Sequence, residues 1–210
     1  MPFARAVTDC HTCPLGVAAG RDGCPFSPSK HDAGQRLVSR GRRGECVTFV
    51  KRGYGGLSAG AGQPLALRAP RSIVGWEALT ATPAAHTLTT LTETETCVID
   101  ADRFRAFAKT RAPAILPLLV AELEQRDCEA RYTRGTARRR LASFLVARLQ
   151  RGGGAYPVEL QYQSLASVLG LRAETLSRVL RELRARGVIA RGRGLFVKDV
   201  VVLQTIAAAA

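Results

Sequence analysis

The chain has 210 residues, of which 46% are hydrophobic, and 31 Lys and Arg against 17 Asp and Glu give a formal net charge of +14. This length allows two modest cores. The most apolar stretch, residues 112–121, is short and contains Pro113 and Pro117, which argues against a membrane-spanning helix. Residues 9–11 read Asp-Cys-His without an apolar run, so no secretory signal is expected and the protein is predicted to be cytoplasmic.

Residues 1–30 are predicted to form a cysteine-rich sensor segment containing Cys10, Cys13 and Cys24. Six cysteines in a chain expected to be cytoplasmic favour metal binding or redox chemistry over structural disulfides. Two thiolates at C-x2-C spacing can bind one metal centre from a single turn, and Cys24 can supply a third ligand. A fourth ligand must then come from elsewhere in the chain.

Residues 31–110 are rich in Gly, Thr and Val, and they contain short apolar runs at 46–50, 66–68 and 96–99 that end in turn residues. Many short strands with frequent glycines indicate an antiparallel β-roll. Cys46 lies in the first run and Cys128 in the helix that follows the roll. Both are interpreted as small apolar residues, not as ligands.

Residues 111–134 change to a helical pattern and are predicted to connect the roll to the rest of the chain. The apolar stripe of this helix consists of Leu116, Leu119, Val120 and Leu123. The stripe could pack on the roll of its own chain, or it could pair with the same helix of a second chain. The second arrangement gives a homodimer.

Residues 135–210 contain a helix, a tight turn, a second helix and a hairpin. Leu165, Ala166 and Leu169 recur at helical spacing, Gly170 supplies the turn, and the second helix is expected to run to about Arg186. The buried stripe of this second helix is predicted to be Leu176, Val179, Leu180 and Leu183. After a helix end at Gly187, runs at 188–190 and 195–197 flank the hairpin tip. The terminal run 207–210 is expected to fray.

The outer face of the second helix suits DNA base edges. Arg178 and Arg181 can each donate two hydrogen bonds to guanine, Glu174 can accept from the cytosine amino group, and Ser177 can do either. Arg191 and Arg193 at the hairpin tip suit phosphates. Residues 131–198 hold 15 Lys or Arg and 3 Asp or Glu, so the positive charge is concentrated in this region. A helix pair with a merely solvated arginine face is the alternative to DNA binding.

With roll, connecting helix and winged helix-turn-helix in this order, the chain resembles the Crp/Fnr family of bacterial transcription regulators over nearly its whole length. The resemblance is strongest at residues 170–180, Gly-Leu-Arg-Ala-Glu-Thr-Leu-Ser-Arg-Val-Leu, where Glu174, Thr175, Ser177 and Arg178 are similar to the recognition-helix signature. It implies an α+β fold with an N-terminal cyclic-nucleotide-binding-like antiparallel β-roll, a long dimerisation helix and a C-terminal winged helix-turn-helix.

The resemblance also implies function and partners. The chain is expected to be a homodimeric regulator that binds double-stranded DNA at a palindromic operator with TTGAT-like half-sites, and RNA polymerase is a candidate further partner. The family's cyclic-nucleotide pocket combines a Gly-Glu helix start with an Arg-Ser or Arg-Thr pair. The matching stretches, residues 75–79 and 84–87, lack that arginine. A cyclic nucleotide is therefore not expected, although Arg68 or Arg71 could substitute.

Cys97 lies where the oxygen-sensing Fnr branch carries its distant cluster ligand. Resemblance to that branch implies a 4Fe-4S cluster bound by Cys10, Cys13, Cys24 and Cys97, which would sense oxygen or redox state and control dimerisation and operator binding. Ten residues separate Cys13 from Cys24, a longer interval than in the best-known members. The alternatives are a zinc site that includes either His11 or Cys97, a thiol–disulfide switch, a nitric-oxide response, haem bound through a lone histidine, and a disordered tail without function.

An enzyme is not expected. The chain has three histidines, no Gly-x-Ser-x-Gly or phosphate-binding loop, and scattered acidic residues. A metal or redox carrier with a basic end that serves only solubility is the remaining alternative, and an operator-binding assay separates it from a regulator.

Overall fold

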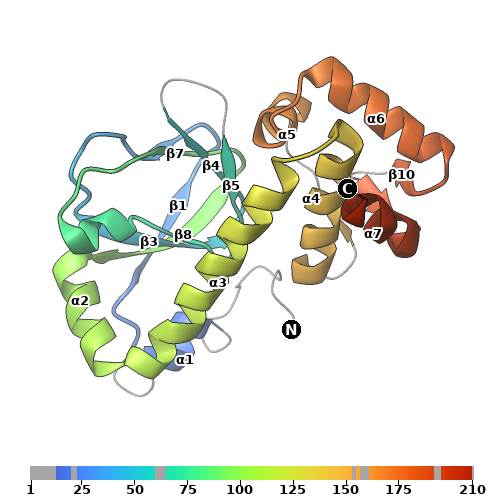
Figure 1. Cartoon of the computed structure of the whole chain (residues 1–210). Coiled ribbons are helices and arrows are strands. Elements are labelled where there is room, and N and C mark those ends of the chain that lie inside the picture. The colour runs from blue at the N-terminus through green and yellow to red at the C-terminus, as the bar shows by residue number, and fades with distance from the viewer. Residues whose placement is uncertain are drawn as a thin grey trace. The chain divides into compact units, whose positions relative to one another are not determined.

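The computed structural model describes residues 13–19, 23–59, 65–152, 155–156, 161–191 and 195–209. The chain divides into two compact units (Figure 1). The roll unit comprises the described residues up to 59 together with 66–124, and the C-terminal unit comprises Leu65 and the described residues from 125 onward. The division falls inside helix α3 (Ala112–Tyr132), so this helix contributes to both units.

The roll unit contains two four-stranded antiparallel sheets, which confirms the predicted β-roll. The first has the order β1-β8-β3-β6, and the second has the order β2-β7-β4-β5. Its strands are β1 (Ser27–His31), β2 (Arg36–Val38), β3 (Cys46–Arg52), β4 (Gly55–Ser58), β5 (Ala66–Arg68), β6 (Ile73–Val74), β7 (Thr87–Thr90) and β8 (Thr94–Asp100). The three apolar runs recognised in the sequence are β3, β5 and β8. Strand β1 begins within the segment that the sequence assigned to the cysteine-rich sensor.

The core of the roll unit is formed by residues of the first sheet and of helices that flank it in the sequence. Val47, Phe49 and Ile99 are buried together with residues of α1 (Pro14–Ala19) and α2 (Ala101–Thr110). Helix α2 begins where the Asp100 carboxylate accepts hydrogen bonds from two backbone N–H groups of its first turn. Phe104 of α2 makes an edge-to-face contact with Trp76 at a centroid distance of 5.9 Å. These contacts anchor α2 on the sheet.

Helix α3 turns one face to the roll and a different apolar face outward. Ile115 and Leu118 are buried in the roll core. The predicted stripe is on the outward side, with exposed fractions of 61% for Leu116, 40% for Leu119, 45% for Val120 and 62% for Leu123. The alternative in which this stripe packs on its own roll is therefore wrong. Helical spacing places residues 115, 118 and 122 on the inner side instead.

The C-terminal unit has the predicted winged helix-turn-helix. Its described elements are α4 (Ala137–Gly152), β9 (Ala155–Tyr156), α5 (Tyr162–Val168), α6 (Ala173–Ala185), β10 (Ile189–Arg191), β11 (Leu195–Val197) and α7 (Val200–Ala208). Gly170, with a φ of 61°, forms the turn between α5 and α6, and Gly187, with a φ of 71°, follows α6. The four predicted stripe residues of α6 are all buried. Strand β9 pairs with β11 and was not anticipated.

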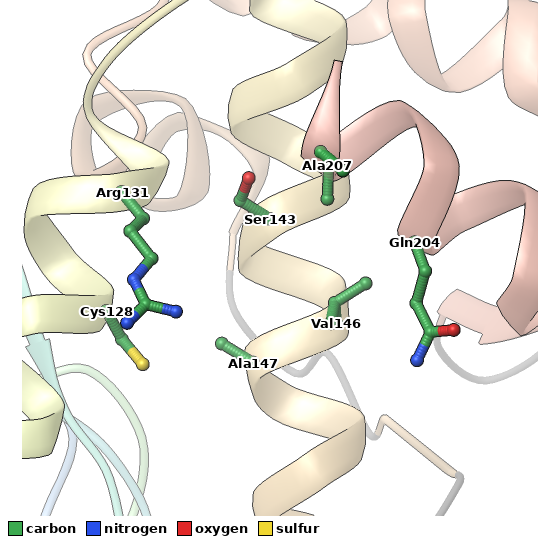
Figure 2. A pocket seen from close by; sticks show the side chains of 8 residues that line it. Cys128, Arg131, Ser143, Val146, Ala147, Gln204 and Ala207 are labelled. Atoms are coloured by element: carbon green, nitrogen blue, oxygen red, sulfur yellow. The ribbon is translucent and has the colours of Figure 1, made fainter. Parts of the chain in front are cut away.

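Helix α7 includes residues 207 and 208, which corrects the expectation of fraying for these two alanines; Ala209 follows the helix, and Ala210 lies outside the described residues. The Asp199 carboxylate caps α7 by accepting from the Val202 N–H at 2.9 Å, and Leu203 is fully buried. Helix α7 also forms one wall of a cavity of about 230 Å³ whose other walls are α3 and α4 (Figure 2). The capping carboxylate and the buried leucine explain why residues 207 and 208 remain helical.

None of the helices in the described ranges combines the length and apolar character that a membrane span requires.

Candidate nucleic-acid interface and cysteine site

Helix α6 presents the predicted base-reading side chains on one open face. Glu174, Ser177, Arg178 and Arg181 are exposed and Thr175 is partly exposed. The opposite face of the helix is buried in the C-terminal unit. Because burial fixes the rotation of the helix about its axis, the four exposed side chains point away from the protein together, and Thr175 lies at the edge of this face. The face combines two guanidinium groups, one carboxylate and two hydroxyls, which is the chemistry of direct base readout.

The hairpin that follows α6 is antiparallel, as expected. Ile189 pairs with Val197 and Ala190 with Phe196. Arg191 is the last residue of β10 and pairs with Leu195. Arg193 lies outside the described residues, so the proposed phosphate contacts of the hairpin tip stay a prediction.

An ion pair that the sequence pattern does not reveal connects α6 to α4. Glu182 of α6 pairs with Arg138 of α4 and with Arg186 one turn further along α6. In the sequence, Arg138-Arg139-Arg140 is visible only as a run of positive charge. The sequence could not reveal this ion pair, because Glu182 is far from Arg138 along the chain and no local pattern links the two residues.

Two of the predicted metal ligands belong to one buried cluster. Cys13, immediately before α1, and Cys97 in β8 lie in the core of the roll unit. Cys97 is opposite Pro28 of β1 and Phe49 of β3 in the sheet register. Cys24 is exposed and precedes β1 by three residues. Cys10 and the alternative ligand His11 lie outside the described residues.

The described residues fit a four-thiolate centre only in part. Thiolates suit both zinc and iron–sulfur clusters, and the low-dielectric surroundings of Cys13 and Cys97 are compatible with either. Within the described ranges, however, no three His, Cys, Asp or Glu side chains are grouped closely enough to hold a metal ion. For a four-thiolate centre to form, Cys24 would have to turn toward Cys13 and Cys97, and Cys10 would have to supply the fourth thiolate.

One of the two remaining cysteines, Cys46, has a thiol that is poorly suited to bind a metal. Desolvation, followed by the negative charges of Asp100 and Glu45, raises the pKa of the Cys46 thiol above its ordinary value. A raised pKa keeps this thiol protonated near neutral pH, whereas metals bind the thiolate. Cys128 lines the cavity of Figure 2, in the C-terminal unit.

The stretch that corresponds to a cyclic-nucleotide pocket has the expected helix start. Gly75, with a φ of 92°, leads into the 3-10 helix η2 (Trp76–Thr80). Arg68, named above as a substitute for the missing arginine, is buried and lies 3.7 Å from a carboxylate oxygen of Glu122 in α3. To bind a phosphate, this guanidinium would have to leave a buried carboxylate. This engagement disfavours Arg68 as a nucleotide ligand.

Comparison with known proteins agrees with this architecture. Residues 28–111 match the cyclic nucleotide-binding domain, and residues 139–206 match the Crp-like helix-turn-helix domain. No curated protein sequence matches the chain.

Solved structures show the same fold. FixK2 from Bradyrhizobium japonicum is 20% identical with a TM-score of 0.75, over 88% of this chain and 98% of that one. A CRP-family transcriptional regulator from Thermus thermophilus is 20% identical with a TM-score of 0.69, over 87% and 97%. A variant of CooA from Carboxydothermus hydrogenoformans is 18% identical with a TM-score of 0.72, over 99% and 98%. With its two matching domains in this order, the chain belongs to the Crp/Fnr family of DNA-binding transcription regulators.

Proposed function

We propose that α6 reads the operator with Glu174, Ser177 and Arg178, supported by Thr175 and Arg181, while the arginines of the hairpin tip contact phosphates. The observation that carries this proposal is the exposed polar face of α6 opposite a fully buried apolar face. TTGAT-like half-sites follow from the resemblance of this helix to the family signature.

The same proposal includes a homodimer formed through α3. Leu116, Leu119, Val120 and Leu123 expose a contiguous apolar stripe on a helix whose other face is already packed on the roll. Such a patch indicates an interface. A second copy of this chain is the expected occupant, because two recognition helices related by a two-fold axis match a palindromic operator.

Replacing Arg178 by Ala tests the reading role. We expect the variant to lose about 1–3 kcal/mol of operator binding and to discriminate less at one guanine, because a bidentate contact to that base disappears. Competition between a duplex with two TTGAT half-sites and duplexes with single base changes measures both effects. Equal weakening on every duplex, with a smaller salt dependence, would instead make Arg178 a phosphate contact.

The sensing part of the proposal is a 4Fe-4S cluster bound by Cys10, Cys13, Cys24 and Cys97, which responds to oxygen or redox state. Its support is that Cys13 and Cys97 share a buried cluster with Ile115 and Leu118 of α3. Any rearrangement of these cysteines therefore acts on residues that seat the first half of the proposed dimerisation helix. In the Fnr branch such a cluster supplies an oxygen-labile group.

Anaerobic purification followed by iron, sulfide and absorption analysis tests the cofactor. We expect a brown protein with about four irons and four sulfides per chain that bleaches in air. Cys97→Ala should fold without the cluster and bind operator weakly in the absence of oxygen, whereas the control Cys128→Ser should keep both properties.

A colourless wild type with zinc or no metal would remove the iron–sulfur proposal and leave the DNA-binding proposal intact. Full anaerobic operator affinity in Cys97→Ala would contradict the coupling between cluster and DNA binding.

A further inference from the structure

Arg140, in the first turn of α4, connects two loops of the C-terminal unit through backbone carbonyls. Its Nε donates to the Gly135 carbonyl at 2.9 Å. Its Nη1 donates to the Leu169 carbonyl at 3.3 Å and to the Gly170 carbonyl at 3.1 Å. Gly135 belongs to the connector between α3 and α4, and residues 169–170 form the turn between α5 and α6. One guanidinium therefore joins the connector to the turn that precedes the recognition helix.

We infer that Arg140 is a positioning residue that sets the orientation of α6 and transmits movements of the α3–α4 connector to it. This inference deepens the proposed function, since it rests on α6 being the DNA-reading helix. Arg140 itself reads no base in this role.

The contact geometry shows why a guanidinium is suited to this place. The carbonyls at the C-terminal end of α5 have no partner further along that helix, and a positive charge there also complements the helix dipole. Gly170 has a φ of 61°, and a Cβ at this position would lie 3.2 Å from Nη1 of Arg140. The guanidinium is therefore packed directly against the backbone of the turn, where a side chain would crowd it.

A second contact from the same turn of α4 holds the other half of α6. Arg138, two residues before Arg140, pairs with Glu182, which in turn pairs with Arg186 at 3.2 Å. The recognition helix is thus held near its start through Arg140 and in its second half through Arg138. Of these two arginines, Arg140 is the one that also contacts the α3–α4 connector, through the Gly135 carbonyl. Arg140 is therefore the residue that can pass a movement of the connector to α6.

Lysine cannot replace this arrangement. The guanidinium donates in fixed, divergent directions from Nε and Nη1, whereas an ammonium group is a single point on a flexible chain. Charge and geometry can therefore be separated by comparing Arg140→Lys with Arg140→Gln. Arg148→Gln is the matched control: it makes the same charge change on the same helix at a side chain that lies over the Phe144 ring, 5.5 Å from its centroid.

The experiment uses the full chain and the DNA duplex that the wild type enriches from a random pool. Affinity is measured over a series of salt concentrations, and amide hydrogen exchange is measured without DNA at Gly170 and Leu171, which donate to Ser167 and Ala166 within the turn. We expect both Arg140 variants to bind about tenfold more weakly with an unchanged salt slope, and the two amides to exchange about tenfold faster. Arg148→Gln should leave all three readouts near wild type.

Three results would overturn the inference. Wild-type affinity in Arg140→Lys would mean that charge alone matters. A salt slope reduced by about 0.9 would make Arg140 a phosphate contact. A lower melting temperature with unchanged affinity and unchanged exchange at the turn would leave only a general structural role. If the wild type enriches no duplex, the proposed DNA reading fails instead, and hydrogen exchange still decides whether Arg140 holds the turn.

Discussion

Glu122→Gln is expected to lower the free energy of unfolding of the roll unit by about 3–5 kcal/mol. The side chains of Glu122 and Arg68 are only 8% and 7% exposed, with an N–O distance of 3.7 Å. Removing the negative charge leaves the Arg68 guanidinium in a buried position without its carboxylate. Urea unfolding followed by the fluorescence of Trp76, the single tryptophan, measures the effect, because Trp76 packs against the roll core.

Two further variants show whether the buried charge is the cause. Glu124→Gln removes the same charge from an exposed position on the same helix and should change stability by no more than about 0.5 kcal/mol. The double variant Arg68→Met with Glu122→Leu should recover most of the loss, since well-packed apolar side chains can replace a buried ion pair. Equal stability of Glu122→Gln and Glu124→Gln would show that the pair does not stabilise the roll.

Leu180→Ala is expected to destabilise the C-terminal unit by about 2–5 kcal/mol, because the variant loses buried apolar surface and leaves a cavity. Leu180 is 1% exposed at the centre of the α6 stripe. Its neighbour Arg181 is exposed, so Arg181→Ala should change stability by no more than about 0.5 kcal/mol while weakening DNA binding. Circular dichroism during thermal unfolding gives the stabilities.

Operator affinity is then measured well below both melting temperatures, where both variants are folded. We expect the loss of affinity to be larger for Arg181→Ala than for Leu180→Ala. The opposite order would mean that Arg181 is merely a solvated charge and that core packing governs the shape of the DNA-reading face.

Helix α3 contacts several of the parts that the proposals involve. Its inner face packs with Cys13 and Cys97 in one cluster, and Glu122 pairs with Arg68 of β5. Its outer face carries the proposed dimer stripe. Arg140 then connects the segment after α3 to the turn before α6. A change at the cysteines would therefore alter the packing of the roll core that seats the first half of α3.

The sequence by itself determined the elements that have a local pattern. The α6 stripe, the turn at Gly170 and the hairpin after Gly187 follow from helical spacing and from glycine's access to positive φ. The strands of the roll follow from short apolar runs between turn residues. These patterns are visible because the residues responsible are neighbours in sequence. The roles of individual side chains at the DNA are predictions from their chemistry and exposure, and the cluster-binding role of the four cysteines is a prediction from family resemblance.

Only the tertiary structure decided which face of α3 meets the roll, how Arg68 and Glu122 pair, and what Arg140 holds. Helix α3 has two apolar faces, so its sequence does not specify which face is buried until the sheet against which it packs is known. The sequence likewise does not show which residue a charged side chain in a basic run contacts, because contacts between residues far apart in the chain produce no periodic pattern. Helix α7 was missed for the same reason, since its helical alanines depend on the packing of Leu203 in the C-terminal unit.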